Sequence, residues 1–111
     1  MKNSKFQIFI GRDNQFYCRL YAKNGEIILG SEGYVSKSGC QNGISSVKEN
    51  TPKDERYVRK TATDGQFYFV LTAPNNEVIG KSEMYTTERR RNDGIEAVKK
   101  TAPDAPIEDI N

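Results

Sequence analysis

The sequence predicts an α+β protein that arose by tandem duplication, and three observations lead to this prediction. Shifting the 111-residue chain by 51 positions aligns residues 13–52 with residues 64–103 without a gap, and 17 of these 40 pairs are identical. Each copy opens with alternating apolar and polar residues, which is typical of strands. Each copy then changes to apolar residues three positions apart, which is typical of a short amphipathic helix. Identity far above chance at one fixed offset indicates two copies of one structural unit.

The strands are predicted from the period-two pattern and its turn residues. Residues 16–22 and 67–73 alternate in this way, and earlier strands are expected at 6–10 and at the equivalent 57–61. Asn24-Gly25 favours a hairpin turn, because both residues tolerate positive φ, and Asn75-Asn76 replaces it in the second copy. A further strand follows each turn, at 26–30 and 77–81.

One helix is predicted in each copy. The narrow apolar stripes consist of Ile44 with Val47, and of Ile95 with Val98. Ser36 and Thr87 are suitable N-cap residues, and a proline just beyond each helix marks its end. Each unit therefore has the order strand, strand, strand, helix.

We expect one domain over residues 1–111, made of repeat 1 (6–54) and repeat 2 (57–107). A unit of about 50 residues buries too little surface to be stable alone, so the two units should share one core. Residues 56–60 align both with residues 5–9 and with 107–111, so the strand after the first helix also begins the second unit. Residues 107–110 then predict a short closing edge strand.

The doubled motifs Gln-Phe-Tyr, Asn-Gly-Glu, Ser-Glu-x-Tyr and Gly-Ile-x-x-Val-Lys resemble the YegP-like family of small bacterial proteins over residues 6–103. The resemblance implies two β-β-β-α-β units that form a single antiparallel sheet. It also implies exchanged C-terminal strands and two helices packed on one face. It implies no biochemical activity, because none is established for the family.

The composition excludes several chemistries. The chain has no histidine, so histidine bases, catalytic triads and histidine metal sites are impossible, and two cysteines cannot form a structural zinc site. We find no glycine-rich phosphate loop. We therefore expect no catalytic residues, no metal and no cofactor, and we expect that the protein is not an enzyme.

Localisation and thiol chemistry follow from the same inspection. The polar N-terminal residues do not resemble a signal peptide, and no apolar run reaches the ~20 residues of a membrane span. We expect a cytoplasmic protein with reduced thiols. Cys18 falls on the apolar face of a strand and should be shielded. Cys40, near a helix start, is either a reactive thiol or an incidental helical residue.

The first candidate surface is the polar side of the predicted sheet. Tyr17, Arg19, Tyr21 and Tyr68 lie there by alternation, and Phe9 and Lys60 could join them. Aromatic residues interleaved with basic ones suit RNA-binding sheets. They equally suit self-association, or strands that are merely half exposed.

Two further sets of residues are candidates. The motif Ser31, Glu32 and Tyr34 recurs as Ser82, Glu83 and Tyr85. It is either a pair of related sites or the exit from strand to helix. The run Arg89, Arg90 and Arg91 has no counterpart in the first copy, and it is either a basic patch that contacts a partner or solvated charge.

The leading hypothesis is a non-enzymatic interaction module that uses the open sheet face or the helix surface, for a protein partner or for self-association. The alternative is binding of nucleic acid or another polyanion, although the net charge of +2 gives it little support. A small enzyme is the third hypothesis, and no membrane partner is expected.

Overall fold

The structure is a computed structural model that describes residues 3–110. Its elements, in chain order, are β1 (Lys5–Ile10), β2 (Phe16–Tyr21), β3 (Ile27–Gly30), α1 (Lys37–Asn50), η1 (Asp54–Arg56), β4 (Tyr57–Thr61), β5 (Phe67–Thr72), β6 (Val78–Lys81), α2 (Glu88–Thr101), η2 (Ala102–Asp104) and β7 (Ile107–Asp109). The predicted strands and helices are therefore confirmed, and the two units have the same order of elements.

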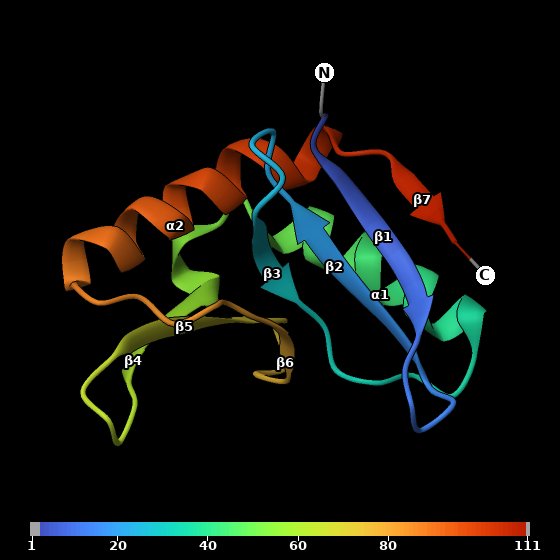
Figure 1. The fold of residues 1–111 in the computed structure, drawn as a ribbon, viewed down its shortest axis with the longest axis horizontal. Coiled ribbons are helices and arrows are strands. Elements are labelled where there is room, and N and C mark those ends of the chain that lie inside the picture. Colours follow the sequence, from blue (N-terminus) through green and yellow to red (C-terminus); the bar gives the residue numbers. More distant parts are fainter. Residues whose placement is uncertain (1–2, 111) are drawn as a thin grey trace.

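All seven strands form one sheet in the order β4-β5-β6-β3-β2-β1-β7 (Figure 1). Figure 1 shows β1 to β3 nearly face-on and β4 to β6 nearly edge-on, so the sheet twists strongly between its halves. The halves meet where Gly30 pairs with Lys81. These residues are 51 positions apart, so equivalent residues of the two repeats pair with each other on a pseudo-two-fold axis.

The expectation of a wholly antiparallel sheet is wrong at one edge. β7 pairs with β1 in parallel, and Phe6 lies opposite Ile107. The chain leaves η2 at the end of the sheet where β1 begins, and the N–H of Phe6 donates to Pro106 O at 2.8 Å. β7 must therefore run in the same direction as β1. The sheet is mixed, with the predicted exchange of the last strand.

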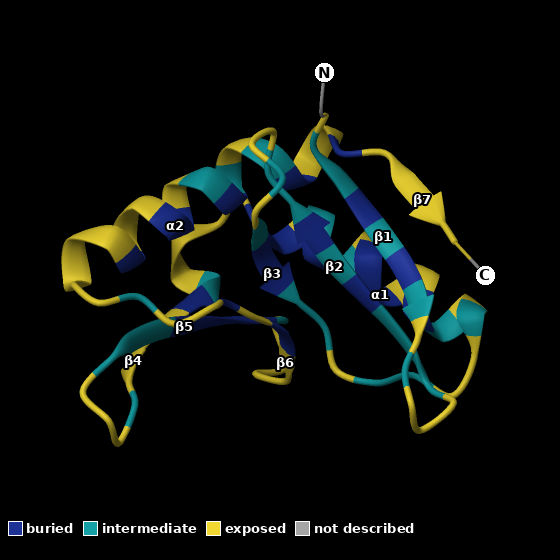
Figure 2. Cartoon of the chain, viewed as in Figure 1, coloured by how far each residue is buried: buried dark blue, intermediate teal, exposed yellow. Residues whose placement is uncertain are grey.

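Each helix crosses from its own unit to the other. α1 packs on β2 of its own unit and also on β5 and β6, whereas α2 packs on β5 and on β3. Figure 2 shows buried residues concentrated on the strand and helix surfaces that face each other. The core accordingly combines both units, and its large fully buried members are Phe6, Ile8, Leu20, Ile44, Val47, Phe69, Leu71, Ile95 and Val98.

Local sequence explains where the elements begin. The Ser36 hydroxyl accepts a hydrogen bond from Gly39 N, and Thr87 caps α2 in the same way. In the hairpin between β2 and β3, Gly25 has φ 84°, while the Asn24 side chain accepts a hydrogen bond from Glu26 N at 3.0 Å. Asn76 takes the left-handed position of the equivalent hairpin between β5 and β6, with φ 70°. In the described part of the chain, neither helix is long and apolar enough to cross a membrane.

Candidate functional site

The helices leave one face of the sheet uncovered, and the first unit places a cluster of aromatic and basic side chains there. We call it the open-face cluster: Lys5, Gln7, Phe9, Tyr17, Arg19 and Tyr21. The pairing of β1 with β2 builds it, because Gln7 lies opposite Arg19 and Phe9 lies opposite Tyr17. Their strand neighbours Phe6, Ile8, Cys18 and Leu20 point to the core. Alternation along two paired strands thus brings four of the residues named for this surface together, namely Phe9, Tyr17, Arg19 and Tyr21.

Arg19 is the centre of the open-face cluster. Its guanidinium carbon lies 4.0 Å from the centroid of the Phe9 ring and 5.7 Å from that of Tyr21. Its Nε donates to Gln7 Oε1 at 3.1 Å. Among residues 3–110 the guanidinium forms no ion pair. The structure therefore holds a half-buried cation in a fixed orientation without an anionic partner.

Tyr17 is held in place from two sides. Its ring stacks on Phe9 with centroids 5.7 Å apart and an interplanar angle of 20°, and its hydroxyl donates to Asp13 Oδ2 at 2.6 Å. This bond lowers the pKa of the Asp13 carboxyl and raises the pKa of Tyr17. The Tyr17 hydroxyl is thus occupied by an intramolecular bond, and its ring belongs to a preassembled stack.

Polar residues connect the open-face cluster to β7. The Tyr21 hydroxyl donates to Gln7 Oε1 at 3.3 Å, and Gln7 Nε2 donates to Glu108 Oε1 at 3.1 Å. Lys5 pairs with the same Glu108 oxygen at 2.9 Å and lies 5.6 Å from the Tyr21 ring centroid. The bonds from Lys5 and Gln7 lower the pKa of Glu108. Sequence reasoning missed Gln7, Lys5 and Glu108, although the alternation that selected Arg19 and Tyr21 also places Gln7 on this face.

Tyr68 lies on the same face but in the second unit. Its contact is with Lys81, whose Nζ lies 5.1 Å from the ring centroid, and Lys60 is its neighbour across β4 and β5. Val70 and Thr72 stand where the first unit has Arg19 and Tyr21. The second unit therefore repeats the aromatic position of Tyr17 without the surrounding cluster.

The repeated serines end the third strand of each unit. Ser31 Oγ accepts from Cys18 N at 2.9 Å and donates to Glu32 O, so a side-chain oxygen continues the ladder where the strand stops. Ser82 makes the same two bonds, with Phe69 N and Glu83 O. These hydroxyls are consumed by backbone groups, which supports the interpretation of the motif as a strand exit.

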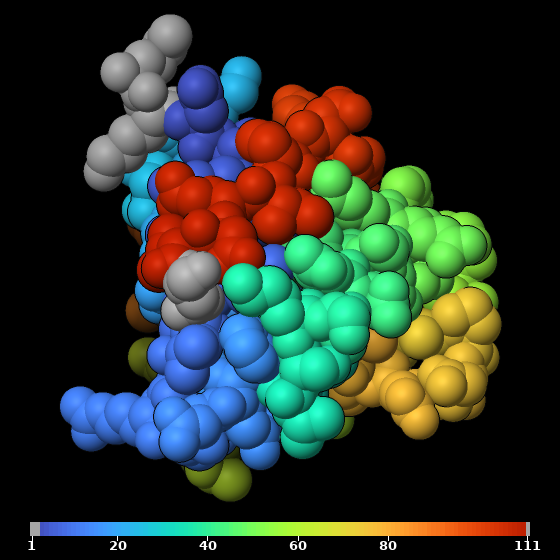
Figure 3. Space-filling model, turned by 90° about the vertical axis from the view of Figure 1, so that its right-hand side faces the viewer, coloured from blue at the N-terminus to red at the C-terminus, as the bar shows by residue number. Residues whose placement is uncertain are grey.

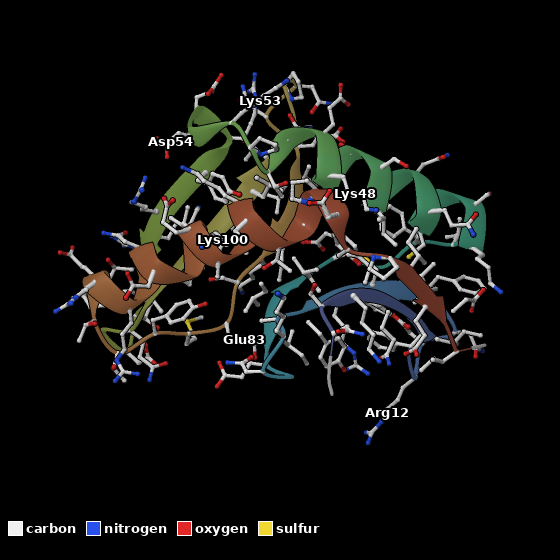
Figure 4. All side chains as sticks on the ribbon, turned by 90° about the horizontal axis from the view of Figure 1, so that it is seen from above. Arg12, Lys48, Lys53, Asp54, Glu83 and Lys100 are labelled. Atoms are coloured by element: carbon white, nitrogen blue, oxygen red, sulfur yellow. The ribbon has the colours of Figure 1, made fainter. Side chains whose placement is uncertain are left out.

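The repeated tyrosines and glutamates have different positions. Tyr34 and Tyr85 pack against the core, and burial raises the pKa of both phenols. Glu32 and Glu83 are exposed and line one shallow hollow of about 870 Å³ at the pseudo-two-fold axis, together with Tyr17 and Lys81. Figure 4 shows Glu83 on the side of the molecule away from α1. The structure thus brings the two carboxylates to one surface.

The three arginines of α2 separate into two groups. Arg89 and Arg90 are exposed and line a hollow of about 520 Å³ beside the β2–β3 hairpin. Arg91 is 6% exposed, lies 5.5 Å from the Phe67 ring centroid and donates to Lys60 O at 3.4 Å. Arg91 therefore does not belong to an exposed patch, because its aliphatic stem and guanidinium pack onto the sheet.

Both cysteines are buried, which favours the incidental helical residue over the reactive thiol for Cys40. Cys40 has no exposed surface, and burial raises the pKa of its thiol to about 12. Burial also raises the pKa of Cys18. Packing against the sheet outweighs the helix N-terminus, which otherwise lowers a thiol pKa. The described residues contain no group of three side chains suited to hold a metal ion.

The fold and the doubled motif define a class of proteins with two α+β repeats, and comparisons with known proteins assign the family. The model of "Domain of unknown function (DUF1508)" matches twice, at residues 12–57 and 62–109. The chain belongs to this family, whose curated relatives are the bacterial UPF0339 proteins.

The relatives match nearly the whole chain. A UPF0339 protein encoded upstream of the ptx operon of Stutzerimonas stutzeri is 48% identical over 105 residues, which is 95% of each chain. YegP of Escherichia coli K12 is 46% identical over 104 residues, which is 94% of each chain. The family resemblance stated from the motifs is therefore confirmed, and these descriptions name neither an activity nor a ligand.

Two solution structures have the same fold. The NMR structure of YegP from E. coli, described as a protein of unknown function, has a TM-score of 0.92 at 44% identity and covers 99% of this chain and 95% of its own. That of SO3888 from Shewanella oneidensis has a TM-score of 0.90 at 38% identity and covers 96% and 91%. The predicted α+β fold is confirmed by both.

Proposed function

We propose that this protein is a non-enzymatic binding module and that its ligand contacts the open-face cluster. The observation that carries the proposal is the position of Arg19. A guanidinium that is stacked on Phe9, oriented by Gln7 and without an ion-pair partner in the described chain is prepared to receive an anionic group. Little side-chain entropy remains to be lost on binding, because its neighbours already fix it.

The chemistry of the side chains supports a binding role over catalysis. The chain has no histidine, and burial raises the pKa of the Cys40 thiol and of the Tyr34 and Tyr85 phenols away from neutrality. General acid–base catalysis works best with groups that titrate near the operating pH. Cytoplasmic localisation is part of the proposal, because both thiols are free.

A protein partner is the first candidate ligand, and quantitative capture tests it. Wild-type protein, Arg19→Gln and Arg90→Gln would each be immobilised and exposed to nuclease-treated bacterial lysate, with bound proteins measured by mass spectrometry. The two variants lose the same charge on different surfaces. We expect a partner that is retained by wild type and by Arg90→Gln, and that is reduced roughly fivefold or more by Arg19→Gln. Equal capture by both variants would show that the open-face cluster does not bind it.

Single-stranded nucleic acid is the second candidate ligand, and the stack of Phe9 and Tyr17 beside Arg19 favours it. Titration of fluorescent single-stranded RNA and DNA at two salt concentrations tests it, with wild type and with Tyr17→Ala plus Tyr68→Ala. Each stacked base is worth on the order of 1–3 kcal/mol, so the double variant should bind at least tenfold more weakly. No detectable binding near physiological salt excludes this ligand. If binding is lost only when Arg89 and Arg90 are neutralised, the nucleic acid binds at α2 and not at the open-face cluster.

A further inference from the structure

The two repeats differ at the outer edges of the sheet. β1 and β4 are equivalent strands, since Phe6 pairs with Leu20 and Tyr57 pairs with Leu71, 51 positions later in each case. β7 lies along the outer side of β1 (Figure 1), and Figure 3 shows this C-terminal segment packed between β1 and α1. Among the described residues, no strand lies beyond β4. The place that β7 fills in the first unit is therefore vacant in the second.

The outer edge of β4 is accessible from Val58 onward. Residues 58–61 are all exposed, and Val58 is 41% exposed. On β1, the carbonyl of Ile8 accepts a hydrogen bond from Ile110 N at 3.2 Å. The equivalent carbonyl on β4 belongs to Arg59. The bond from Phe6 N to Pro106 O has no counterpart, because Tyr57 N already donates to Asp54 O. An added strand would thus form most of the main-chain hydrogen bonds with β4 that β7 forms with β1.

A basic side chain already stands where β7 needs one. Lys5 pairs with Glu108 of β7 at 2.9 Å, and the residue equivalent to Lys5 is Arg56. The Nε atom of Arg56 is buried and has no hydrogen-bond partner in the described chain. Nε itself is closed to an added strand, but the Arg56 guanidinium also forms no ion pair among the described residues. An acidic side chain placed like Glu108 would pair with this charge.

The charge of β4 selects against a second copy of this chain as the occupant. Two β4 strands paired with each other would bring Arg59 and Lys60 against the same residues of the other copy. The acidic residues of β7 are already neutralised, since Glu108 pairs with Lys5 and Asp109 pairs with Lys37 at 2.7 Å. The occupant must therefore be a different chain that carries negative charge.

We propose that β4 is a docking edge for an extended segment of a partner protein. The segment adds to the sheet parallel to β4 and places a carboxylate against Arg56. The residue that follows the carboxylate in this segment is not acidic. On β7 that residue is Asp109, which pairs with Lys37. The position equivalent to Lys37 is occupied by Glu88, which would repel an acidic residue. Affinity comes from main-chain hydrogen bonds and selectivity from these alternate side chains. The proposal concerns another surface than the open-face cluster and stands independently of the proposed function.

The chain's own closing strand provides the probe. The peptide has the sequence of residues 104–110 with Asp109→Asn. The substitution removes the repulsion between this residue and Glu88. It also removes the charge that pairs with Lys37, so the peptide is less able to displace β7 from β1. It would be titrated to about 2 mM into the ¹⁵N-labelled full chain, because the addition of one short strand gives weak affinity. We expect amide shift changes centred on residues 57–61.

A charge exchange tests the role of Arg56. Arg56→Glu should weaken binding of the peptide about tenfold, and a peptide that also carries Glu108→Lys should bind this variant better than it binds wild type. Arg12→Glu makes the same charge change on an exposed hairpin (Figure 4) and should leave binding unchanged. If Arg56→Glu does not fold, Arg56→Gln with the same peptides replaces it and should weaken binding in the same direction.

Three outcomes would overturn the proposal. One is the absence of shift changes at the highest peptide concentration. Another is changes centred on residues 5–10 and 107–110, which would mean that the peptide displaces β7 from β1. The third is equal affinity of wild type, Arg56→Glu and Arg12→Glu, which would mean that no carboxylate contacts Arg56.

Discussion

The ring of Tyr34 lies so close to Gly43 of α1 that a Cβ at Gly43 would stand 2.6 Å from the ring carbon Cζ. Tyr85 has the same relationship to Gly94 in α2, where the distance would be 2.7 Å. The tyrosine of each strand exit thus requires the glycine of the following helix. This contact explains why two motifs that are separate in the sequence occur together in both repeats.

Replacing that glycine should destabilise the protein. We expect Gly43→Ala to lower the free energy of unfolding by about 2 kcal/mol, although alanine favours a helix, because Tyr34 must move. Urea denaturation measures the change. Gly30→Ala is the control, since its Cβ would meet Lys81 O at an ordinary 3.9 Å. A cost that persists unchanged in a Tyr34→Ala background would contradict the steric explanation.

Both thiols should be unreactive in the native protein. Cys18 and Cys40 are buried and their pKa values are raised, so neither should react with a thiol reagent at pH 8 within the time in which an exposed cysteine reacts completely. Absorbance of released thionitrobenzoate measures this, and both should react after denaturation. Rapid native labelling of either cysteine would contradict the packing of α1 on β2.

The buried thiols should also make stability depend on alkaline pH. Burial raises the pKa of Cys40 from the ordinary thiol value of 9.0 to about 12 in the folded state. The unfolded state therefore releases the proton first, and the stabilisation is complete below pH 9 and is lost as the pH rises towards 12. Urea midpoints at pH 7, 9 and 10.5 should fall, and less steeply in Cys40→Ala. An identical pH dependence in that variant would assign the loss to other groups.

Arg91 should contribute to stability, whereas its neighbours should not. Arg91→Ala removes the contact with the Phe67 ring and the bond to Lys60 O, so we expect a loss of about 1–2 kcal/mol. Arg89→Ala and Arg90→Ala remove the same charge from exposed positions and should change stability by about 0.5 kcal/mol or less. Thermal unfolding of the three variants makes the comparison, and equal losses would contradict it.

The first repeat should not fold as a monomer by itself. A chain of residues 1–62 keeps α1 but loses β6 and η2, on which α1 packs, and loses β7 beside β1. We expect an unfolded chain or a homodimer that restores the missing contacts. Amide resonance dispersion and light scattering distinguish these results, and a folded monomer would disprove the interdependence of the repeats.

The fold was predictable because the duplication doubles every local signal. Alternation located the paired strands, and the caps at Ser36 and Thr87 located the helix starts within one residue. The direction of β7 was not predictable from pattern. It depends on where η2 delivers the chain relative to Phe6, which is a tertiary relationship.

The candidate site was predictable in part for the same reason. Alternation placed Tyr17, Arg19 and Tyr21 together, but it could not show that Gln7 and Glu108 orient them, because Glu108 arrives from 101 residues away. The predicted basic patch wrongly included Arg91. This residue aligns with the buried Cys40, and an arginine can be buried there because it packs on the ring of Phe67. Charge in the sequence does not reveal which side of a helix is buried.

The crossing of each helix to the other repeat determines how the molecule can form during synthesis. α1 ends at Asn50, and β6, on which it packs, begins 28 residues later at Val78. A ribosome needs on the order of seconds to add those residues. At the start of that interval the first helix is complete, but of the strands on which it packs only β2 of its own unit is available. The nascent chain therefore exposes the part of α1 that will later pack on β5 and β6 until those strands have been made.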